Sequence, residues 1–252
     1  MRITLSPQDY ATAFHLLSRT ARHPETLGQW VEAQLLSRLP ARPSLLDVGA
    51  GPGAIARRLA PHFGALTLLE PNKEQLAAFD LPGARLIHST LEDFTGPGTY
   101  DLVLCSHVLY HAPLDQWGAF VDRLLSLVRP GGFCLIVLGG ARGHNYEMHR
   151  DFTSTVITSE QLKAVLKQKS LGFEVAVTQN GFSAESFEEM YTLCRFFVFE
   201  DCLTPERVAA LSEEEARALE ARIREHTERC RGPDGVYRLT QEDELILLSR
   251  PA

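Results

Sequence analysis

Residues 45–57 read LLDVGAGPGAIAR, and this stretch decides the fold class. Two leucines and Asp47 precede Gly49, Gly51 and Gly53, which alternate with other residues before a small apolar run. Such a pattern predicts a buried strand that runs through a glycine turn into a helix. Because glycine lacks a β-carbon, the turn can be tight and a ligand can lie against its backbone. The first N–H groups of the helix would then face that ligand, so the stretch predicts a binding site.

A second acid, Glu70, ends the apolar run 66–69, roughly 20 residues after the glycine turn, which is the spacing of a ribose-binding acid. Such an acid closes the second strand of a Rossmann-like unit and suits the two hydroxyls of a ribose. A dinucleotide site has a related pattern, whose third glycine is replaced here by Ala54, and that pattern sometimes accepts alanine. Asp47 and Gly53 favour a nucleoside without a pyrophosphate, and a dinucleotide enzyme stays open as the alternative.

Further apolar runs continue the alternation of strands and helices. Residues 85–88 and the continuous apolar run 101–105 predict two more strands of a sheet that is buried on both faces. A helix is expected over 114–128, ended by the Arg-Pro-Gly-Gly turn 129–132. After the next strand, residues 139–146 are expected to form a flexible loop that shapes a substrate pocket. The remaining strands are expected over 133–138, 173–177 and 245–248.

These motifs resemble the class I S-adenosylmethionine (SAM)-dependent methyltransferases, which share the acid-x-Gly-x-Gly-x-Gly motif, the ribose acid and the Arg-Pro-Gly-Gly turn. The resemblance implies an α/β fold with a doubly wound, seven-stranded, mostly parallel Rossmann-like sheet and an antiparallel last strand. It also implies SAM as the cofactor, with the end of the fourth strand beside its methionine half. The cofactor-binding residues implied are Asp47, Gly49, Ala50, Gly51, Gly53, Glu70, Pro71, Gln75, Thr90, Leu91 and Ser106.

A narrower resemblance is to histamine N-methyltransferase and its relatives. That family carries a Tyr-x-x-x-Phe pair in an N-terminal lid helix, then a His followed by a Glu that binds the amine substrate. It also shows Glu-Pro-x-x-x-Gln after the second strand, a Leu-Tyr pair after the fourth, and an Ile-Thr-Ser helix start. This chain has Tyr10, Phe14, His23 and Glu25, and the later motifs at 70–75, 109–110 and 157–159.

The loop after the fifth strand departs from that family. There, tryptophans enclose the imidazole of the substrate, whereas this chain offers His144, Asn145 and Tyr146. A small amine or amino acid other than histamine is therefore expected as the substrate.

The residues expected to carry chemistry follow from the properties of an amine acceptor. An amine must arrive unprotonated and aligned, and Glu25, His107 or His111 could accept its proton. The alternative role for each histidine is a structural hydrogen bond. Aromatic rings could face a sulfonium by cation–π contact or could be core residues. The catalytic candidates are Tyr10, Glu25, His107, Tyr110 and His111, and the substrate-binding candidates are Phe14, His144, Asn145 and Tyr146.

The sequence predicts a single SAM-binding domain over 1–252. Residues 1–40 are expected to form a helical lid, 41–180 the Rossmann core, 181–240 a helical insertion and 241–252 the last strand. Capping boxes that begin helices are expected at Ser6 with Asp9, Thr158 with Gln161, and Ser212 with Glu215.

Composition narrows the class of partner. The formal net charge is −7 and no lysine and arginine cluster is present, which argues against nucleic acid as a substrate. No run approaches the roughly 20 apolar residues of a membrane span, and the N-terminus lacks a signal-peptide core, so we expect a cytoplasmic protein. The 5 cysteines include no Cys-x-x-Cys pair and the 9 histidines show no metal-binding spacing, so neither a disulfide framework nor a metal is expected.

Three functions remain open at this level. The leading one is methyl transfer to a nitrogen of a small metabolite. The second is a cyclase in which the amino group of SAM attacks its own γ-carbon, forming azetidine-2-carboxylate and releasing methylthioadenosine. The third is a SAM-binding protein without catalysis. The sequence sets no oligomeric state.

Overall fold

A seven-stranded sheet runs through the chain in the strand order β3-β2-β1-β4-β5-β7-β6. The structure is a computed structural model that describes residues 7–77, 79–96 and 98–251. The pairs β1–β2, β1–β4, β2–β3 and β4–β5 are parallel, and β7 pairs antiparallel with β5. The predicted α/β fold is thereby confirmed. The strands are β1 (Ser44–Val48), β2 (Ala65–Glu70), β3 (Arg85–His88), β4 (Tyr100–Ser106), β5 (Val128–Gly139), β6 (Glu174–Ala184) and β7 (Tyr237–Ser249).

Helices connect these strands. The α-helices are α1 (Pro7–Thr20), α2 (His23–Trp30), α3 (Ala54–Leu59), α4 (Lys73–Ala77), α5 (Trp117–Ser126), α6 (His144–Phe152), α7 (Ser159–Gln168), α8 (Phe187–Phe197), α9 (Pro205–Ala209) and α10 (Glu213–Arg229). The short 3-10 helices are η2 (Leu36–Arg38), η3 (Ala60–His62), η4 (Leu109–His111) and η5 (Leu114–Gln116), and the π-helical segments are η1 (Val31–Leu35) and η6 (Val198–Cys202).

The chain divides into two compact units, which we describe separately. Unit 1 contains residues 1–23, 140–156 and 179–242, and unit 2 contains residues 24–139, 157–178 and 243–252. The single domain predicted from the sequence over 1–252, with its four parts, stays a prediction.

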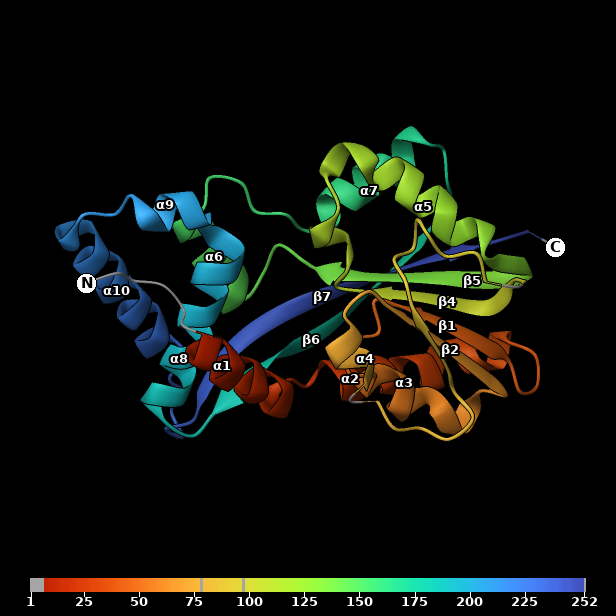
Figure 1. The fold of residues 1–252 in the computed structure, drawn as a ribbon, viewed down its shortest axis with the longest axis horizontal. Coiled ribbons are helices and arrows are strands. Elements are labelled where there is room, and N and C mark those ends of the chain that lie inside the picture. Colours follow the sequence, from red (N-terminus) through yellow and green to blue (C-terminus); the bar gives the residue numbers. More distant parts are fainter. Residues whose placement is uncertain (1–6, 78, 97, 252) are drawn as a thin grey trace. The chain divides into compact units, whose positions relative to one another are not determined.

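Unit 2 has three layers, a sheet with helices on both faces, because successive side chains along each strand point to opposite faces of the sheet. Val103 and Cys105 of β4 face a core shared with Trp117 of α5 and Leu162 of α7. Leu104 faces the opposite core, to which α2, η1 and α3 contribute. Figure 1 shows α5 and α7 on one side of the sheet and α2 and α3 on the other. Since both faces of these strands are covered, the continuous apolar runs of the sequence are explained.

Unit 1 is mainly helical. Helices α1, α6, α8 and α10 surround a core that includes Met148, Met190 and Phe197, all of which are buried. Helix α8 contacts both α1 and α10. Parts of β6 and β7 complete this unit. Within the described residues, no helix is both long and apolar enough to cross a bilayer.

Several predicted elements need correction. Helix α6 begins at His144, so the expected flexible loop ends earlier, because the His144 N–H donates to the Thr240 hydroxyl (3.1 Å) and Gly143 supplies a φ of 97°. Strand β5 begins at Val128 rather than 133, and the expected helix 114–128 is the 3-10 segment η5 followed by α5. Strands β6 and β7 are longer than predicted, at 11 and 13 residues.

Two of the three predicted capping boxes are confirmed. The side chains of Thr158 and Gln161 bond reciprocally with the backbone at the start of α7. Ser212 and Glu215 do the same at the start of α10. The third, at Ser6, lies outside the described residues.

Candidate functional site

The glycine turn joins β1 to α3 in unit 2, and each of its three glycines has a left-handed backbone. The φ angles of Gly49, Gly51 and Gly53 are 68°, 54° and 75°. A β-carbon on Gly53 would lie 2.0 Å from the Phe79 ring, and one on Gly49 would lie 2.4 Å from Val108. At Gly51 the one neighbour is the Gln75 side-chain oxygen, at 3.0 Å. Gly49 and Gly53 therefore lack a β-carbon because the side chains of Val108 and Phe79 occupy that space. At Gly51 the space beside the backbone is bordered only by the end of the Gln75 side chain, among the described residues.

Glu70 fixes this turn to the end of β2. Its side chain is buried, and its two carboxylate oxygens accept the N–H of Gly51 and the N–H of Asn72, each at 2.8 Å. Each carboxylate oxygen has two lone pairs, so both retain capacity for a further donor. A ribose with two adjacent hydroxyls offers two such donors.

Asp47 lies next to the last residue of β1 and is 2% exposed. Its Oδ2 is a buried oxygen with no hydrogen-bond partner among the described residues. Burial and then the charge of Glu70 raise the pKa of Asp47 to about 7. A native group of this kind is costly unless a ligand supplies the missing donor, so the carboxyl is prepared for one.

The loop after β2 borders this region. Pro71, Asn72 and His88 line an open pocket together with Lys73 and Glu74. The His88 ring is held by the Pro71 carbonyl at 2.9 Å.

Two of the predicted cofactor residues have roles within the fold. The Thr90 hydroxyl accepts the Asp93 N–H at 3.2 Å, and Leu91 is buried in the core beneath α5. Their contact with a cofactor stays a prediction.

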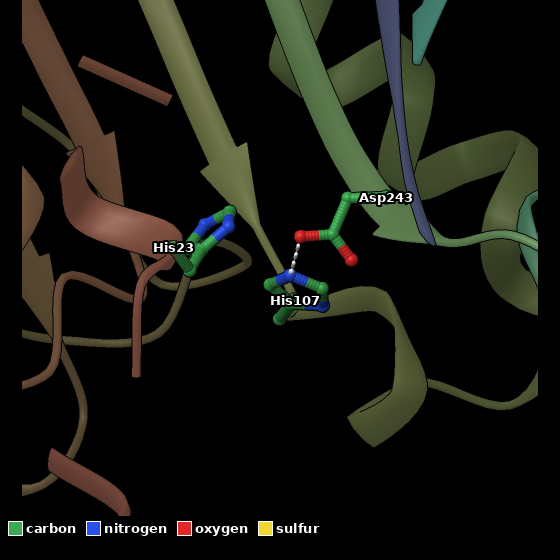
Figure 2. A group of neighbouring side chains, drawn as sticks. All are labelled: His23, His107 and Asp243. Atoms are coloured by element: carbon green, nitrogen blue, oxygen red, sulfur yellow. Dashed lines mark ion pairs between the residues drawn. The ribbon is translucent and has the colours of Figure 1, made fainter. Parts of the chain in front are cut away.

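A second group of polar side chains gathers where β4 and β5 end. His107 directly follows Ser106, has a φ of 56°, and donates its backbone N–H to the Val137 carbonyl at 2.9 Å. Its Nε2 lies 3.5 Å from Oδ2 of Asp243, as Figure 2 shows, and Asp243 is fully buried. Asp243 pairs with Gly139 across β7 and β5. The buried carboxylate of Asp243 therefore contacts the His107 imidazole, which lies at the carboxyl ends of the parallel strands.

Tyr110 completes this group. Its ring lies parallel to the His107 ring at 6.0 Å, and its hydroxyl accepts the Gly139 N–H at 2.6 Å. His111, on the same short helix, is exposed. Tyr110 thus holds the end of β5 against the turn after β4, and it fixes one side of the imidazole.

Glu25 occupies a different part of unit 2. Its carboxylate pairs with Arg58 of α3 at 3.0 Å and accepts the Gln29 amide at 2.8 Å. Arg58 also binds Glu32. Glu25 is therefore engaged in a surface ion-pair network, and a role as base stays a prediction.

The other predicted site residues belong to unit 1. Tyr10 stacks on Phe14 at 6.2 Å, and 42% of Tyr10 is exposed. His144, Asn145 and Tyr146 form the first turn of α6, where His144 Nδ1 bonds the Arg238 carbonyl and the Asn145 amide donates to Gln241. Their contacts with a substrate stay predictions.

Asp243 was not among the site residues predicted from the sequence. A partial signal was present, because three consecutive acids, at 242–244, precede the apolar run 245–248 of a strand expected to run antiparallel. The start of such a strand lies at the carboxyl edge of its parallel neighbours, which is where ligands bind in open α/β sheets.

Residues 19–186 match the family model of a methyltransferase domain. The chain belongs to this methyltransferase domain family. The match covers the glycine turn, Glu70, His107 and Tyr110, but not Asp243, and it agrees with the fold.

Curated relatives include a ubiquinone biosynthesis O-methyltransferase of Vibrio parahaemolyticus, 36% identical over 96 residues, which are 35% of this chain and 40% of the relative. Nodulation protein S of Rhizobium tropici is 30% identical over 109 residues, which are 40% of this chain and 44% of that protein. The chain thus spans less than half the length of these curated relatives.

Among solved structures, the N-methyltransferase NodS of Bradyrhizobium japonicum in complex with S-adenosyl-L-homocysteine superposes with a TM-score of 0.55 at 15% identity, over 97% of this chain and 99% of that one. YcgJ of Bacillus subtilis superposes with a TM-score of 0.56 at 14% identity, over 90% of this chain and 99% of that one. At these identities the comparison supports the fold.

Proposed function

We propose that this chain catalyses SAM-dependent methyl transfer to a nitrogen of a small molecule. The observation that carries the proposal is the pair of buried carboxyls, Asp47 and Glu70, at the ends of the neighbouring strands β1 and β2. Family membership supports the class of reaction. The same proposal places the protein in the cytoplasm, with a small molecule rather than nucleic acid as its substrate, in keeping with the net charge of −7.

The chemistry of the donor and acceptor set fits SAM. Glu70 retains lone pairs for ribose hydroxyls, and the buried Oδ2 of Asp47 can accept from a cationic or amide donor. The open backbone at Gly51, next to the Gln75 amide, allows a ligand close approach. Two carboxyls also favour a ligand with net positive charge over one with a pyrophosphate, which they would repel.

When bound, SAM would supply a methyl group on its sulfonium sulfur, and S-adenosylhomocysteine, a neutral thioether, would be the leaving group. In our proposal, His107 accepts the proton of the acceptor nitrogen and buried Asp243 stabilises the resulting imidazolium. Tyr110 orients the His107 ring and keeps the end of β5 in place through Gly139. In this proposal the acceptor is aligned and deprotonated by residues at one edge of the sheet.

The acceptor atom is the part of the proposal that needs a direct test, since the relatives include an O-methyltransferase and an N-methyltransferase. Purified protein is incubated with SAM alone and then with matched panels of small amines and phenols, and the adenosine product is identified by mass spectrometry. We expect S-adenosylhomocysteine only with an amine. Turnover with phenols alone would refute the nitrogen assignment.

Two other outcomes would refute methyl transfer itself. Methylthioadenosine formed from SAM alone would select the cyclase that forms azetidine-2-carboxylate. SAM binding with no product from any acceptor would select the non-catalytic binding protein.

Asp243→Asn supplies the residue-level test. The backbone pairing of Asp243 with Gly139 survives this substitution, so the strand is kept while the carboxylate is lost. We expect turnover with the amine to fall by at least tenfold while S-adenosylhomocysteine still binds. Unchanged turnover would remove His107 and Asp243 from the mechanism.

A further inference from the structure

The part of β7 that belongs to unit 2 begins with two consecutive buried acids that face opposite sides of the sheet. Asp243 is fully buried and Glu244 is 9% exposed. Ile246 packs in the core beneath α5 and α7, and Leu245 packs in the core to which α2 and α3 contribute. Because successive side chains of a strand alternate between its faces, Glu244 faces α7. Asp243 faces the other layer, where it contacts His107 (Figure 2).

Lys163 of α7 compensates the charge of Glu244. Its Nζ lies 2.7 Å from Oε2 of Glu244, and the two side chains are only 16% and 12% exposed. This Oε2 is buried and has no well-aligned hydrogen bond within the described part of the chain, so the contact is mainly electrostatic. The same Nζ donates to Oε1 of Glu160 at 2.7 Å, but 62% of the Glu160 side chain is exposed. Since buried charges attract more strongly than exposed ones, Glu244 is the stronger partner of the lysine.

This ion pair lies at the end of the ladder between β5 and β7. Strand β5 ends at Gly139, whose register partner is Asp243, and Glu244 belongs to the preceding pair. On the β5 side, the Gly139 N–H donates to the Tyr110 hydroxyl at 2.6 Å. On the β7 side, Lys163 ties Glu244 to α7. Ends of elements open locally unless they are held, so each strand has its own anchor at this end of the ladder.

The contact between Asp243 and His107 is sensitive to where β7 begins. Nε2 of His107 and Oδ2 of Asp243 are 3.5 Å apart, which is at the long limit for a hydrogen bond. A small outward shift of the strand would break this contact. Because a single peptide bond joins Asp243 to Glu244, any movement of one of them also moves the other.

We propose that Lys163 is a positioning residue that, through Glu244, keeps Asp243 at the imidazole of the candidate site; this inference rests on the proposed function. Removal of the lysine leaves a buried carboxylate unpaired, and such a charge is strongly unfavourable until it reaches water. The start of β7 would then move with it. The proposed base would lose the carboxylate that stabilises its protonated form.

The first measurement reads the contact between His107 and Asp243 directly. Long-range ¹H–¹⁵N spectra of the full chain give the imidazole resonances of His107, which are assigned by their loss in His107→Gln. We expect Lys163→Met to shift the Nε2 resonance and Lys163→Arg, which keeps the cation, to restore it. Lys169→Met is the matched control, because it breaks an ion pair with Asp122 at the other end of α7 and should leave the resonance in place. An unmoved Nε2 resonance in Lys163→Met would overturn the proposal.

Steady-state kinetics separates positioning from general stability. The acceptor is the amine of the panel with the highest turnover, and kcat is expressed per S-adenosylhomocysteine-binding site so that unfolded protein does not count. We expect Lys163→Met to lower kcat about tenfold and to change KM for SAM less than about twofold, because the candidate cofactor residues follow other strands. Glu160→Gln removes only the exposed partner and should keep kcat within about twofold. Equal losses of kcat and of SAM affinity in Lys163→Met would refute a positioning role.

A double variant keeps the test decisive if Lys163→Met folds poorly. Lys163→Met combined with Glu244→Gln removes both charges and leaves no unpaired buried ion. Glu244→Gln alone completes the cycle. If the two residues act as a pair, the double variant loses no more kcat than Lys163→Met does, whereas additive losses would refute their coupling.

Methyl transfer by the original chain separates this inference from the proposed function. Methyl transfer together with an unchanged Nε2 resonance and an unchanged kcat in Lys163→Met would overturn the positioning role alone. Failure of the original chain to transfer a methyl group to any acceptor would overturn the proposed function and the role of Lys163 in the reaction. The Nε2 resonance would then still decide whether Lys163 places Asp243 beside His107.

Discussion

Replacement of Asp47 by asparagine is expected, at pH 8, to raise stability and to lower cofactor affinity. The pKa of this carboxyl rises from 3.8 to about 7 on folding, because the group is buried and faces the charge of Glu70. The folded protein therefore holds a proton there that the unfolded chain has lost. As the pH rises from about 4 to about 7, stability falls, and above pH 7 the loss is complete.

The magnitude follows from that difference in pKa. Each pKa unit corresponds to about 1.4 kcal/mol, so a shift of roughly three units costs about 4 kcal/mol at high pH. Of this loss of unfolding free energy, roughly 2.5 kcal/mol occurs between about pH 5 and pH 8. Asparagine does not titrate, but its buried amide leaves a donor unsatisfied at about 1–3 kcal/mol. Asp47→Asn is thus expected to change stability little at pH 5 and to be stabilising at pH 8.

Affinity is expected to move the other way. If SAM donates to the ionised Asp47, the dissociation constant of S-adenosylhomocysteine falls as the pH rises through about 7 in the original chain, and asparagine weakens binding roughly 10- to 100-fold. The pH dependence of binding should disappear in the variant.

The assay is urea unfolding at several pH values, together with calorimetric titration of S-adenosylhomocysteine. Asp101→Asn is the matched control, because Asp101 is equally buried but satisfied by Ser44 and Arg129. That variant should lose stability at both pH values and bind the ligand normally. Parallel pH–stability curves for Asp47→Asn and the original chain would refute the reasoning.

Three further outcomes follow from the contacts described. Gly53→Ala places a β-carbon against the Phe79 ring and should lower the melting temperature by several degrees more than Gly51→Ala does. Gly51→Ala should instead weaken S-adenosylhomocysteine binding. Equal melting temperatures for the two variants would contradict these separate roles. Tyr110→Phe leaves the Gly139 N–H without its acceptor and should cost about 1–3 kcal/mol in urea unfolding while turnover falls and cofactor affinity holds. Burial, then a neighbouring arginine, lowers the pKa of His226, so unfolding free energy should drop as the pH falls below 6.5, and His226→Gln should show a shallower acid slope in the same range.

The fold was predictable where local pattern and burial coincide. The glycine turn, the acid at position 70 and the apolar runs of β1 and β4 follow directly from backbone requirements and from a sheet covered on both faces. The capping boxes at Thr158 and Ser212 were predictable because the two bonds of such a box join residues only three positions apart in the sequence.

Long-range contacts account for what the sequence did not reveal. Helix α6 depends on a hydrogen bond from His144 to Thr240, nearly one hundred positions away, and no local pattern reports it. The first part of β7 carries polar residues, so its extent depends on pairing rather than on hydropathy. Asp243 was missed for a related reason, since only the strand order places it behind His107.

The carboxylate of Glu70 has a spectroscopic consequence. Because its two oxygens hold the amide protons of Gly51 and Asn72, any ligand that draws on the same oxygens also polarises those two N–H bonds. The two backbone amides therefore act as an intrinsic pair of reporters, one on the glycine turn and one on the following loop, whose resonances should shift together when the ribose position is filled. A ligand that lacks a ribose, such as free adenine, would leave both resonances unmoved, so filling of the ribose position can be read without any label on the ligand.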